Sequence, residues 1–211
     1  FVDTVWHIGN KTVRKVENKQ EYLMQQTAKI EDSCRIYAEQ SSIFALKNVK
    51  FSVKDREILK GITLEIPKGG RTVFLGENGC GKTTLMRLIA RLYKPTSGDI
   101  TQYIDEKFKQ KPKGNRAWYK KVGVVYQNPD YQLFMPTVRQ EISFGAKSEE
   151  YAAEIAELFG VKHLWERHPQ SLSEGQKRRV SIAAVVACAP EVLLLDEPTV
   201  GQDYDGLCQM V

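Results

Sequence analysis

The nine residues Gly76–Thr84 constrain most strongly what this chain can fold into. They read G-E-N-G-C-G-K-T-T and fit the pattern of a glycine, four free positions and then Gly-Lys-Ser/Thr. The preceding run, Arg71–Leu75, predicts a buried strand, and apolar residues at helical spacing in Leu85–Tyr93 predict a helix. A chance glycine-rich turn is the alternative, but both flanks agree with a phosphate-binding loop. We therefore expect an α/β fold that holds phosphate groups at this loop.

The residue types in the loop match the chemistry of phosphate binding. Glycines let the backbone turn its N–H groups inward around an anion. A helix that begins near Gly81 directs its positive dipole end at the phosphates, and Lys82 adds a full charge. The Thr83 hydroxyl can bind Mg²⁺. We expect contacts to the nucleotide along the whole loop: Gly76, Glu77, Asn78, Gly79, Cys80, Gly81, Lys82, Thr83 and Thr84.

The composition of the 211 residues is that of an ordinary globular protein, with 42% hydrophobic and 27% charged residues. No apolar run approaches the roughly 20 residues that span a bilayer. The cysteines show no metal-binding spacing, so we expect reduced thiols: Cys34, Cys80, Cys188 and Cys208. Cys80 is expected to contribute its backbone N–H to the loop, and the alternative is a modifiable thiol.

A basic stretch between Lys107 and Lys121 carries seven basic residues and no acid, within a chain of net charge +5. Because Trp118 and Tyr119 are interleaved with the charges, a nucleic-acid surface is one interpretation. The favoured interpretation is a solvated surface loop, or one near anionic lipid headgroups.

The first 40 residues predict a separate piece of structure. Val2–Ile8 and Lys11–Val16 alternate like strands around the turn signal Gly9-Asn10, which indicates a hairpin. Asn18–Ala28 is typical of a short helix, and a polar linker follows up to about Ser42.

A second set of strands and helices follows this linker. Phe44–Val53 and Ile58–Ile66 alternate on either side of a charged turn and predict an antiparallel β layer. Lys121–Tyr126 predicts another buried strand. Glu149–Phe159 predicts an amphipathic helix with an apolar side of Tyr151, Ile155, Leu158 and Phe159. Val192–Asp196 is apolar until its last residue, as expected for a strand buried on both faces of a parallel sheet.

Asp196 and Glu197 are the second group of residues that carry chemistry. They follow the apolar strand, and ligands of open α/β sheets bind beyond the carboxyl ends of the strands. Asp196 is expected to hold Mg²⁺ through water, and Glu197 to act as general base on the attacking water. An acidic turn without function is the alternative, which the presence of the phosphate-binding loop disfavours.

Leu172–Gln176 reads L-S-E-G-Q and resembles the L-S-G-G-Q signature of the ATP-binding cassette ATPases. The resemblance covers residues 44–211, with the phosphate-binding loop, the glutamine loop at Gln127, the signature, the acidic strand end and the Asp-loop Gly201–Asp203 in the family's order. It implies a P-loop nucleoside triphosphatase fold: a parallel core sheet, an antiparallel β subdomain and an α-helical subdomain that carries the signature.

The resemblance also implies which residues act on ATP and Mg²⁺. Glu197, Gln127 and Lys82 are the expected catalytic residues, and Thr83, Gln127 and Asp196 the expected metal-binding residues. The signature residues expected to contact ATP are Ser173, Gly175 and Gln176. In this family the signature meets the γ-phosphate held on another nucleotide-binding domain, so two domains enclose ATP. Ser173 and the N–H groups of a helix start are suited to this anion.

Within the family, Val122–Phe134 resembles the Q-N-P-D-x-Q-L-F segment of the energy-coupling factor and cobalt-type importer ATPases. The implied partners are a second nucleotide-binding domain, a transmembrane coupling protein and a substrate-specific membrane subunit, with the chain peripheral on the cytoplasmic face of the membrane. Core packing is the alternative for Tyr131, Leu133 and Phe134. Direct binding of nucleic acid is not expected.

Two other functions are alternatives to the importer. A soluble tandem cassette protein that acts on ribosomes or nucleic acid would use the basic stretch. A non-catalytic binding cassette would tolerate the departures at Val53 and Glu174. The non-catalytic cassette is disfavoured because the residues expected to act on ATP and Mg²⁺ are intact: Lys82, Gln127, Asp196 and Glu197.

The chain departs from the family pattern at three places. Val53 stands where the family often has an aromatic residue that stacks on adenine, so we expect only apolar contact there. Glu174 replaces the first signature glycine and adds a negative charge near the partner's phosphates. The chain ends before the family's switch histidine, and His163 and His168 precede the signature and cannot occupy that place.

The resemblance also sets the expected domain boundaries. Residues 41–211 are expected to form a nucleotide-binding domain that is incomplete after the Asp-loop, truncated at its C-terminus. Residues 1–40 are expected to be the end of a preceding cassette plus a linker, from a tandem protein. The isolated 211-residue chain is therefore expected to hydrolyse ATP poorly.

Overall fold

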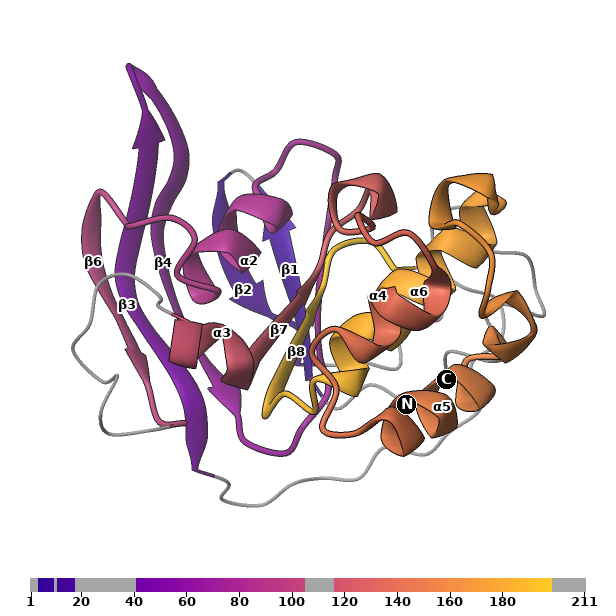
Figure 1. Cartoon of the computed structure of the whole chain (residues 1–211). Coiled ribbons are helices and arrows are strands. Elements are labelled where there is room, and N and C mark those ends of the chain that lie inside the picture. The colour runs from indigo at the N-terminus through magenta and orange to yellow at the C-terminus, as the bar shows by residue number, and fades with distance from the viewer. Residues whose placement is uncertain (1–3, 10, 18–40, 105–115, 199–211) are drawn as a thin grey trace. The chain divides into compact units, whose positions relative to one another are not determined.

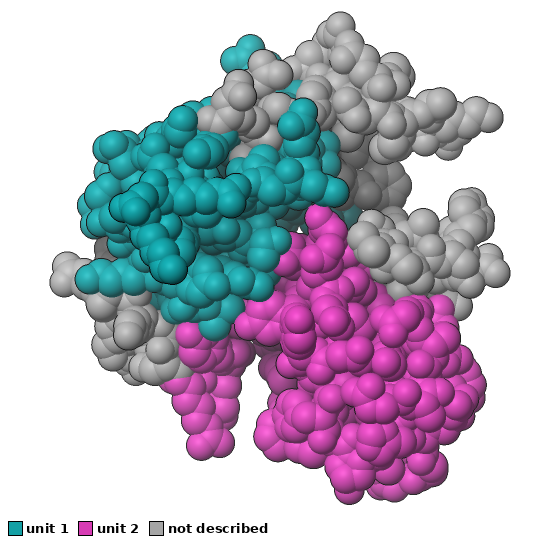
Figure 2. Space-filling view, turned by 90° about the horizontal axis from the view of Figure 1, so that it is seen from above, with its two compact units in different colours: residues 1–113 teal, residues 114–211 magenta. Residues whose placement is uncertain are grey.

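The computed structural model describes residues 4–9, 11–17, 41–104 and 116–198 (Figure 1). The chain divides into two compact units, residues 1–113 and 114–211, which Figure 2 colours separately. The helix expected at 18–28, the part of the basic stretch before residue 116 and the Asp-loop lie outside the described residues.

The first unit contains the expected antiparallel β layer. Strand β3 (Ser42–Val53) lies in the middle, between β4 (Arg56–Pro67) and β6 (Ser97–Gln102), and is antiparallel to both. Its core is formed by apolar side chains that the alternation of the strands directs to one side: Phe44, Leu46, Val49, Leu59, Ile62 and Leu64. The predicted β subdomain is thus confirmed.

A second sheet of this unit includes the strand before the phosphate-binding loop. The predicted N-terminal hairpin is confirmed: β1 (Thr4–Gly9) pairs antiparallel with β2 (Thr12–Lys15). On its other edge β1 runs parallel to β5 (Thr72–Gly76), with Trp6 opposite Phe74. β5 is half-buried along its length, so the expectation of a buried strand was wrong.

The helix after the loop, α2 (Lys82–Ile89), ends four residues before the predicted end at Tyr93. Arg91 adopts a left-handed conformation (φ 59°). The N–H of Leu92 donates to the Arg87 carbonyl at 2.9 Å, and the N–H of Arg91 to Leu88 at 3.0 Å. These two bonds form a Schellman motif, which satisfies the last carbonyls and turns the chain before Pro95 is reached.

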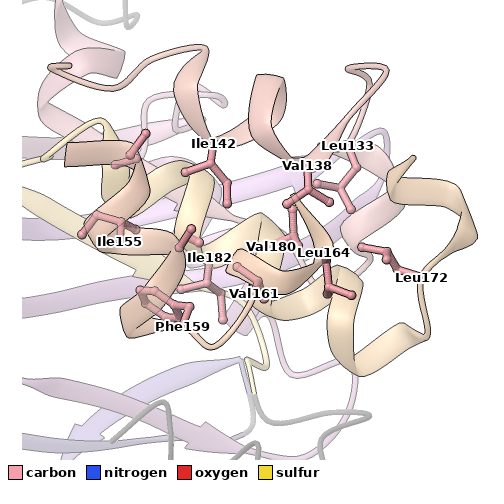
Figure 3. Close-up of a cluster of buried hydrophobic side chains, with 14 of the residues drawn as sticks. Leu133, Val138, Ile142, Ile155, Phe159, Val161, Leu164, Leu172, Val180 and Ile182 are labelled. Atoms are coloured by element: carbon pink, nitrogen blue, oxygen red, sulfur yellow. The ribbon is translucent and has the colours of Figure 1, made fainter. Parts of the chain in front are cut away.

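The second unit packs helices beside a parallel strand pair. β7 (Val122–Val125) and β8 (Val192–Leu195) are parallel, as expected for core strands of this fold. The remaining elements are α3 (Arg116–Lys121), η2 (Pro129–Tyr131), α4 (Val138–Ser143), α5 (Glu149–Leu158), η3 (Lys162–Leu164), η4 (Pro169–Ser171) and α6 (Glu174–Ala187). Side chains from α4, α5 and α6 form the core in Figure 3, among them Ile142, Ile155, Val180 and Ile182.

Two expectations about burial in this unit were wrong. β8 alternates instead of being buried on both faces, since Leu193 and Leu195 are 38% and 41% exposed. On α5 the predicted core residue Leu158 is 67% exposed, while Ala152 and Ala156 are fully buried. Small alanine side chains let this helix approach its neighbours closely, and hydrophobicity alone does not reveal that.

Candidate nucleotide-binding site

The phosphate-binding loop lies between β5 and α2, as predicted. Gly79 and Gly81 have φ angles of 79° and 106°, which L-residues with side chains rarely adopt. A Cβ on Gly81 would also lie 2.8 Å from Cδ2 of Leu59. The carbonyl of Gly81 accepts the N–H of Leu85 at 2.8 Å and so begins the helix. The loop therefore has the backbone shape of an anion site at a helix N-terminus.

Lys82 lies along this loop. Its Nζ donates to the carbonyls of Gly76 at 2.8 Å and Glu77 at 2.9 Å, and lies 4.0 Å from Sγ of Cys80. Thr83 occupies the first turn of α2 and is half-buried. The ammonium and the hydroxyl thus both lie at the start of the helix, where phosphate oxygens and a cation are expected.

Val53 belongs to the same unit. It ends β3, pairs with Arg56 across the turn, and has a side chain that is 51% exposed. The neighbouring strand β4 contacts the loop, because Ile58 and Leu59 surround the Cβ position of Gly81. The β layer thus links the end of β3 to the phosphate-binding loop.

In the second unit, Gln127 and Glu197 meet at the carboxyl ends of β7 and β8. Nε2 of Gln127 donates to Oε2 of Glu197 at 2.5 Å, although 70 residues separate them. Glu197 has a left-handed backbone (φ 48°), a strained conformation of the kind found at functional sites. The preceding Asp196 is buried, and its N–H donates to the Val125 carbonyl at 2.9 Å. The expected general base therefore lies next to the expected glutamine.

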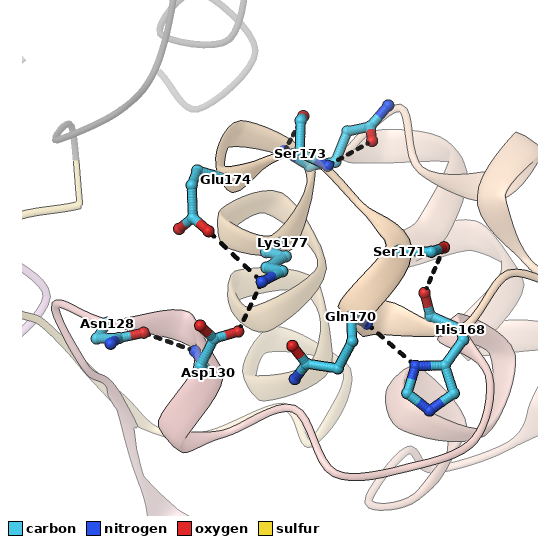
Figure 4. A network of polar contacts seen from close by, with 9 residues as sticks. Asn128, Asp130, His168, Gln170, Ser171, Ser173, Glu174 and Lys177 are labelled. Atoms are coloured by element: carbon cyan, nitrogen blue, oxygen red, sulfur yellow. Dashed lines mark hydrogen bonds and ion pairs between the residues drawn. The ribbon is translucent and has the colours of Figure 1, made fainter.

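The signature residues form the start of α6. Oγ of Ser173 accepts the N–H of Gln176 at 3.3 Å, and Oε1 of Gln176 accepts the N–H of Ser173 at 3.1 Å (Figure 4). A serine followed three residues later by glutamine predicts a capping box, and these two hydrogen bonds form it. Gly175 lies in the first turn and is half-buried. The carboxylate of Glu174 lies 3.4 Å from Nζ of Lys177, which offsets part of its charge.

Three charged residues contact the segment that begins near Gln127, and the sequence alone did not predict these contacts. Arg178 is buried and donates to the carbonyls of Tyr126, at 2.8 Å, and of Gln127. Burial lowers the pKa of Arg178, while the nearby Asp196 carboxylate opposes that shift. Lys177 binds Asp130 at 2.8 Å. Charged residues normally predict a solvated surface, so their sequence carried no signal of burial.

The third of these residues, Glu141, holds the segment that follows Gln127. Its carboxylate accepts the N–H groups of Phe134 at 2.9 Å and Met135 at 2.7 Å. Burial raises the pKa of Glu141, and these two hydrogen bonds oppose the increase. The carboxylate thus fixes the backbone that presents Phe134.

Three aromatic side chains near this segment are exposed: Tyr131 (78%), Phe134 (68%) and Phe144 (68%). The rings of Phe134 and Phe144 are 5.6 Å apart, edge to face. The core-packing alternative is therefore wrong for Tyr131 and Phe134, and it holds for Leu133, which is 5% exposed. Exposed, clustered aromatic residues are typical of an interaction surface.

Trp118 bears on the nucleic-acid alternative. It belongs to α3 and its side chain is fully buried, so it cannot stack on bases, whereas Tyr119 is 39% exposed. One of the two aromatic residues that suggested a nucleic-acid surface is therefore part of the core.

The residue types present also suit Mg²⁺. Thr83 in the first unit, and Gln127 and Asp196 in the second, each offer an oxygen donor, the type that Mg²⁺ prefers. This ion usually combines few protein ligands with substrate phosphates. Across the described ranges, no group of three or more His, Cys, Asp or Glu side chains could hold a metal ion.

The strand, glycine loop and helix define a P-loop nucleotide-binding domain. The family described as "ABC transporter" matches residues 59–200, and the chain belongs to this family.

Three relatives illustrate the similarity. The energy-coupling factor transporter ATP-binding protein EcfA1 of Mycoplasma mobile is 39% identical over 171 residues, which cover 76% of this chain and 61% of the relative. The nickel import ATP-binding protein NikO of Rhodobacter capsulatus is 40% identical, covering 76% and 67%. The putative HMP/thiamine import ATP-binding protein YkoD of Bacillus subtilis is 40% identical, covering 77% and 30%. The chain thus spans 30% to 67% of the length of these relatives.

A solved structure agrees with this family. The structure of cbiO1 from Clostridium perfringens, described as part of the ABC transporter complex cbiONQ, has a TM-score of 0.65 and 33% identity. It covers 81% of this chain and 71% of its own. In the part of our chain that is described, no helix has the length and apolar character needed to cross a membrane.

The family makes the Val53 position testable. We expect Val53→Tyr to tighten ATP binding about tenfold, because stacking on a base contributes about 1–3 kcal/mol. Val53→Leu is the control, since it adds apolar area without an aromatic face. Titrations with ATP and with inorganic triphosphate would be compared. Only ATP binding should tighten; equal ATP affinity for the Tyr and Leu variants would show that Val53 does not contact the base.

Proposed function

We propose that this chain binds and hydrolyses ATP as the nucleotide-binding subunit of an ABC importer of the energy-coupling factor type. The observation that carries the proposal is the 2.5 Å hydrogen bond from Gln127 to Glu197 at the ends of two parallel strands. A carboxylate held there by an amide suits a general base, and the chain also carries a complete phosphate-binding loop.

Each residue of the proposed site has a defined task. Lys82 and the loop N–H groups bind the β- and γ-phosphates. Thr83, Asp196 and Gln127 would hold Mg²⁺, which neutralises charge on the phosphates when bound. Glu197 accepts a proton from the attacking water, and the Gln127 amide orients its carboxylate. The Ser173 end of α6 provides an anion site for the nucleotide of a second domain.

The proposed partners follow from the relatives and from the exposed aromatic residues. The relatives are named as import ATP-binding proteins, for nickel and for HMP/thiamine among others. We infer a second nucleotide-binding domain, a transmembrane coupling protein and a substrate-specific membrane subunit, with the chain on the cytoplasmic face of the membrane. Tyr131, Phe134 and Phe144 are the proposed contacts with the coupling protein, because they are exposed and adjoin the Gln127 segment.

The double variant Phe134→Ser/Phe144→Ser tests this surface. We expect co-purification with the membrane partner to fall at least tenfold, because aromatic anchors dominate interface energies, while ATP affinity stays unchanged. Leu158→Ser is the matched control, since Leu158 is 67% exposed but lies on α5. Unchanged recovery of the membrane partner would contradict the assignment, and co-purification with ribosomes instead would support the soluble alternative.

A further inference from the structure

Two consecutive basic residues of α6, Lys177 and Arg178, hold the segment around Gln127. Arg178 donates to the backbone carbonyls of Tyr126 and Gln127. Lys177 binds the carboxylate of Asp130, three residues further on, at 2.8 Å (Figure 4). Helix α6, which begins with the signature residues, therefore binds both the backbone at Gln127 and the turn η2 that follows it.

The hydrogen bonds of Arg178 and the ion pair of Lys177 differ in how easily they can break. Arg178 bonds from a buried position to two part-buried backbone carbonyls, and its loss would leave both without this charged donor. The Lys177 side chain is 9% exposed, but its partner Asp130 is 40% exposed and can move into solvent. Asp130 belongs to η2, and its N–H donates to Oδ1 of the capping residue Asn128 at 2.9 Å.

Glu174 provides a second carboxylate for the same ammonium. It lies 3.4 Å from Nζ of Lys177, one turn earlier on α6. If Asp130 leaves, the nearly buried Lys177 keeps one partner, which limits the cost of an unpaired charge. Glu174 replaces the usual first glycine of the signature, so this chain has a carboxylate at that position that can accept a hydrogen bond from Lys177.

We propose that the Asp130–Lys177 ion pair is a positioning link that transmits movement at Gln127 to the signature residue Ser173. The path is short: Lys177 donates its backbone N–H to the Ser173 carbonyl at 2.8 Å. Under the proposed function, Gln127 serves this chain's own nucleotide and Ser173 serves that of the second domain. The ion pair then couples the two ATP sites.

Amide hydrogen exchange tests the link in the 211-residue chain, independently of any ATPase activity. Asp130→Asn and Lys177→Gln should each raise the rate of amide hydrogen exchange about tenfold at three positions. These are Gln176, residue 177 and Gln132. The double variant should show no further increase, because both changes remove one interaction. Additive effects, or unchanged exchange at Gln176 in Asp130→Asn, would overturn the proposal.

The matched control is the Arg139–Glu149 ion pair, at 2.6 Å in the same unit but half exposed. Arg139→Gln and Glu149→Gln should leave exchange at Gln176 unchanged, because an exposed pair contributes little. The same increase in these controls would show a general loosening and would overturn the link.

Turnover provides the second test, in the protein assembled with its second domain. Asp130→Asn should lower kcat about tenfold with KM for ATP within about twofold, and Asp130→Glu should restore most of kcat. A parallel loss of ATP affinity would indicate a merely structural role and would overturn the proposal. If the unaltered assembly does not hydrolyse ATP, the proposed function fails, and the exchange experiment still decides the link.

Discussion

Glu197→Gln is expected to lower ATP turnover about a thousandfold and to leave ATP affinity within about threefold. A general base contributes about 10²–10⁴-fold to a rate, and the amide of glutamine cannot accept the proton. The substitution keeps the size of the side chain and a carbonyl oxygen that can accept the hydrogen bond from Gln127. Phosphate release by the protein assembled with its second domain, together with a binding titration, would measure both quantities.

Glu191→Gln is the control for this experiment. Glu191 lies directly before the first residue of β8, whereas Glu197 lies beyond its last residue. Glu191 is exposed and forms an ion pair with Lys121 at 2.5 Å. Its substitution should change turnover less than twofold. If Glu197→Gln kept more than a tenth of the original turnover, Glu197 would not be the general base.

Lys82→Met is expected to weaken ATP binding about a hundredfold, or about 2.7 kcal/mol. A hydrogen bond from a charged group contributes roughly 1.5–3 kcal/mol, and Lys82 contributes both its charge and its position in the loop. Nζ bonds to the Gly76 and Glu77 carbonyls, so the ammonium already lies where the phosphates are expected. Calorimetric or fluorescence titration with ATP would measure the change.

The control for Lys82 is Lys68→Met, an exposed lysine in the turn before β5. This variant removes the same charge from the same unit and should bind ATP with nearly unchanged affinity. Equal losses in both variants would indicate a general effect of net charge and would contradict the role of Lys82.

Features that depend on neighbours in the chain could be predicted from the sequence. The strand, loop and helix around Gly76–Thr84 follow from periodicity and glycine spacing, which act over a few residues. The capping box of Ser173 and Gln176 depends on a separation of three residues, and the N-terminal hairpin on a turn signal. The motif order also led to the family, which the comparison over residues 59–200 confirms.

Contacts between distant residues were decided by the tertiary structure. Periodicity predicted a strand at Val2–Ile8, which the structure has at Thr4–Gly9, but not that it pairs in parallel with β5, because a strand pattern does not specify its partner. Helix α2 ends where Arg91 adopts a left-handed conformation, and the sequence around Arg91 gives no sign of that conformation.

The same distinction applies to the site. The residue types needed for ATP could be found from the sequence: the loop with Lys82, the Gln127 segment, the signature and Glu197. The hydrogen bond from Gln127 to Glu197 across 70 residues, the burial of Lys177 beside Asp130 and the exposure of Phe134 became known from the fold. Burial and long-range pairing arise from packing between elements, while residue type and spacing constrain only local conformation and chemistry.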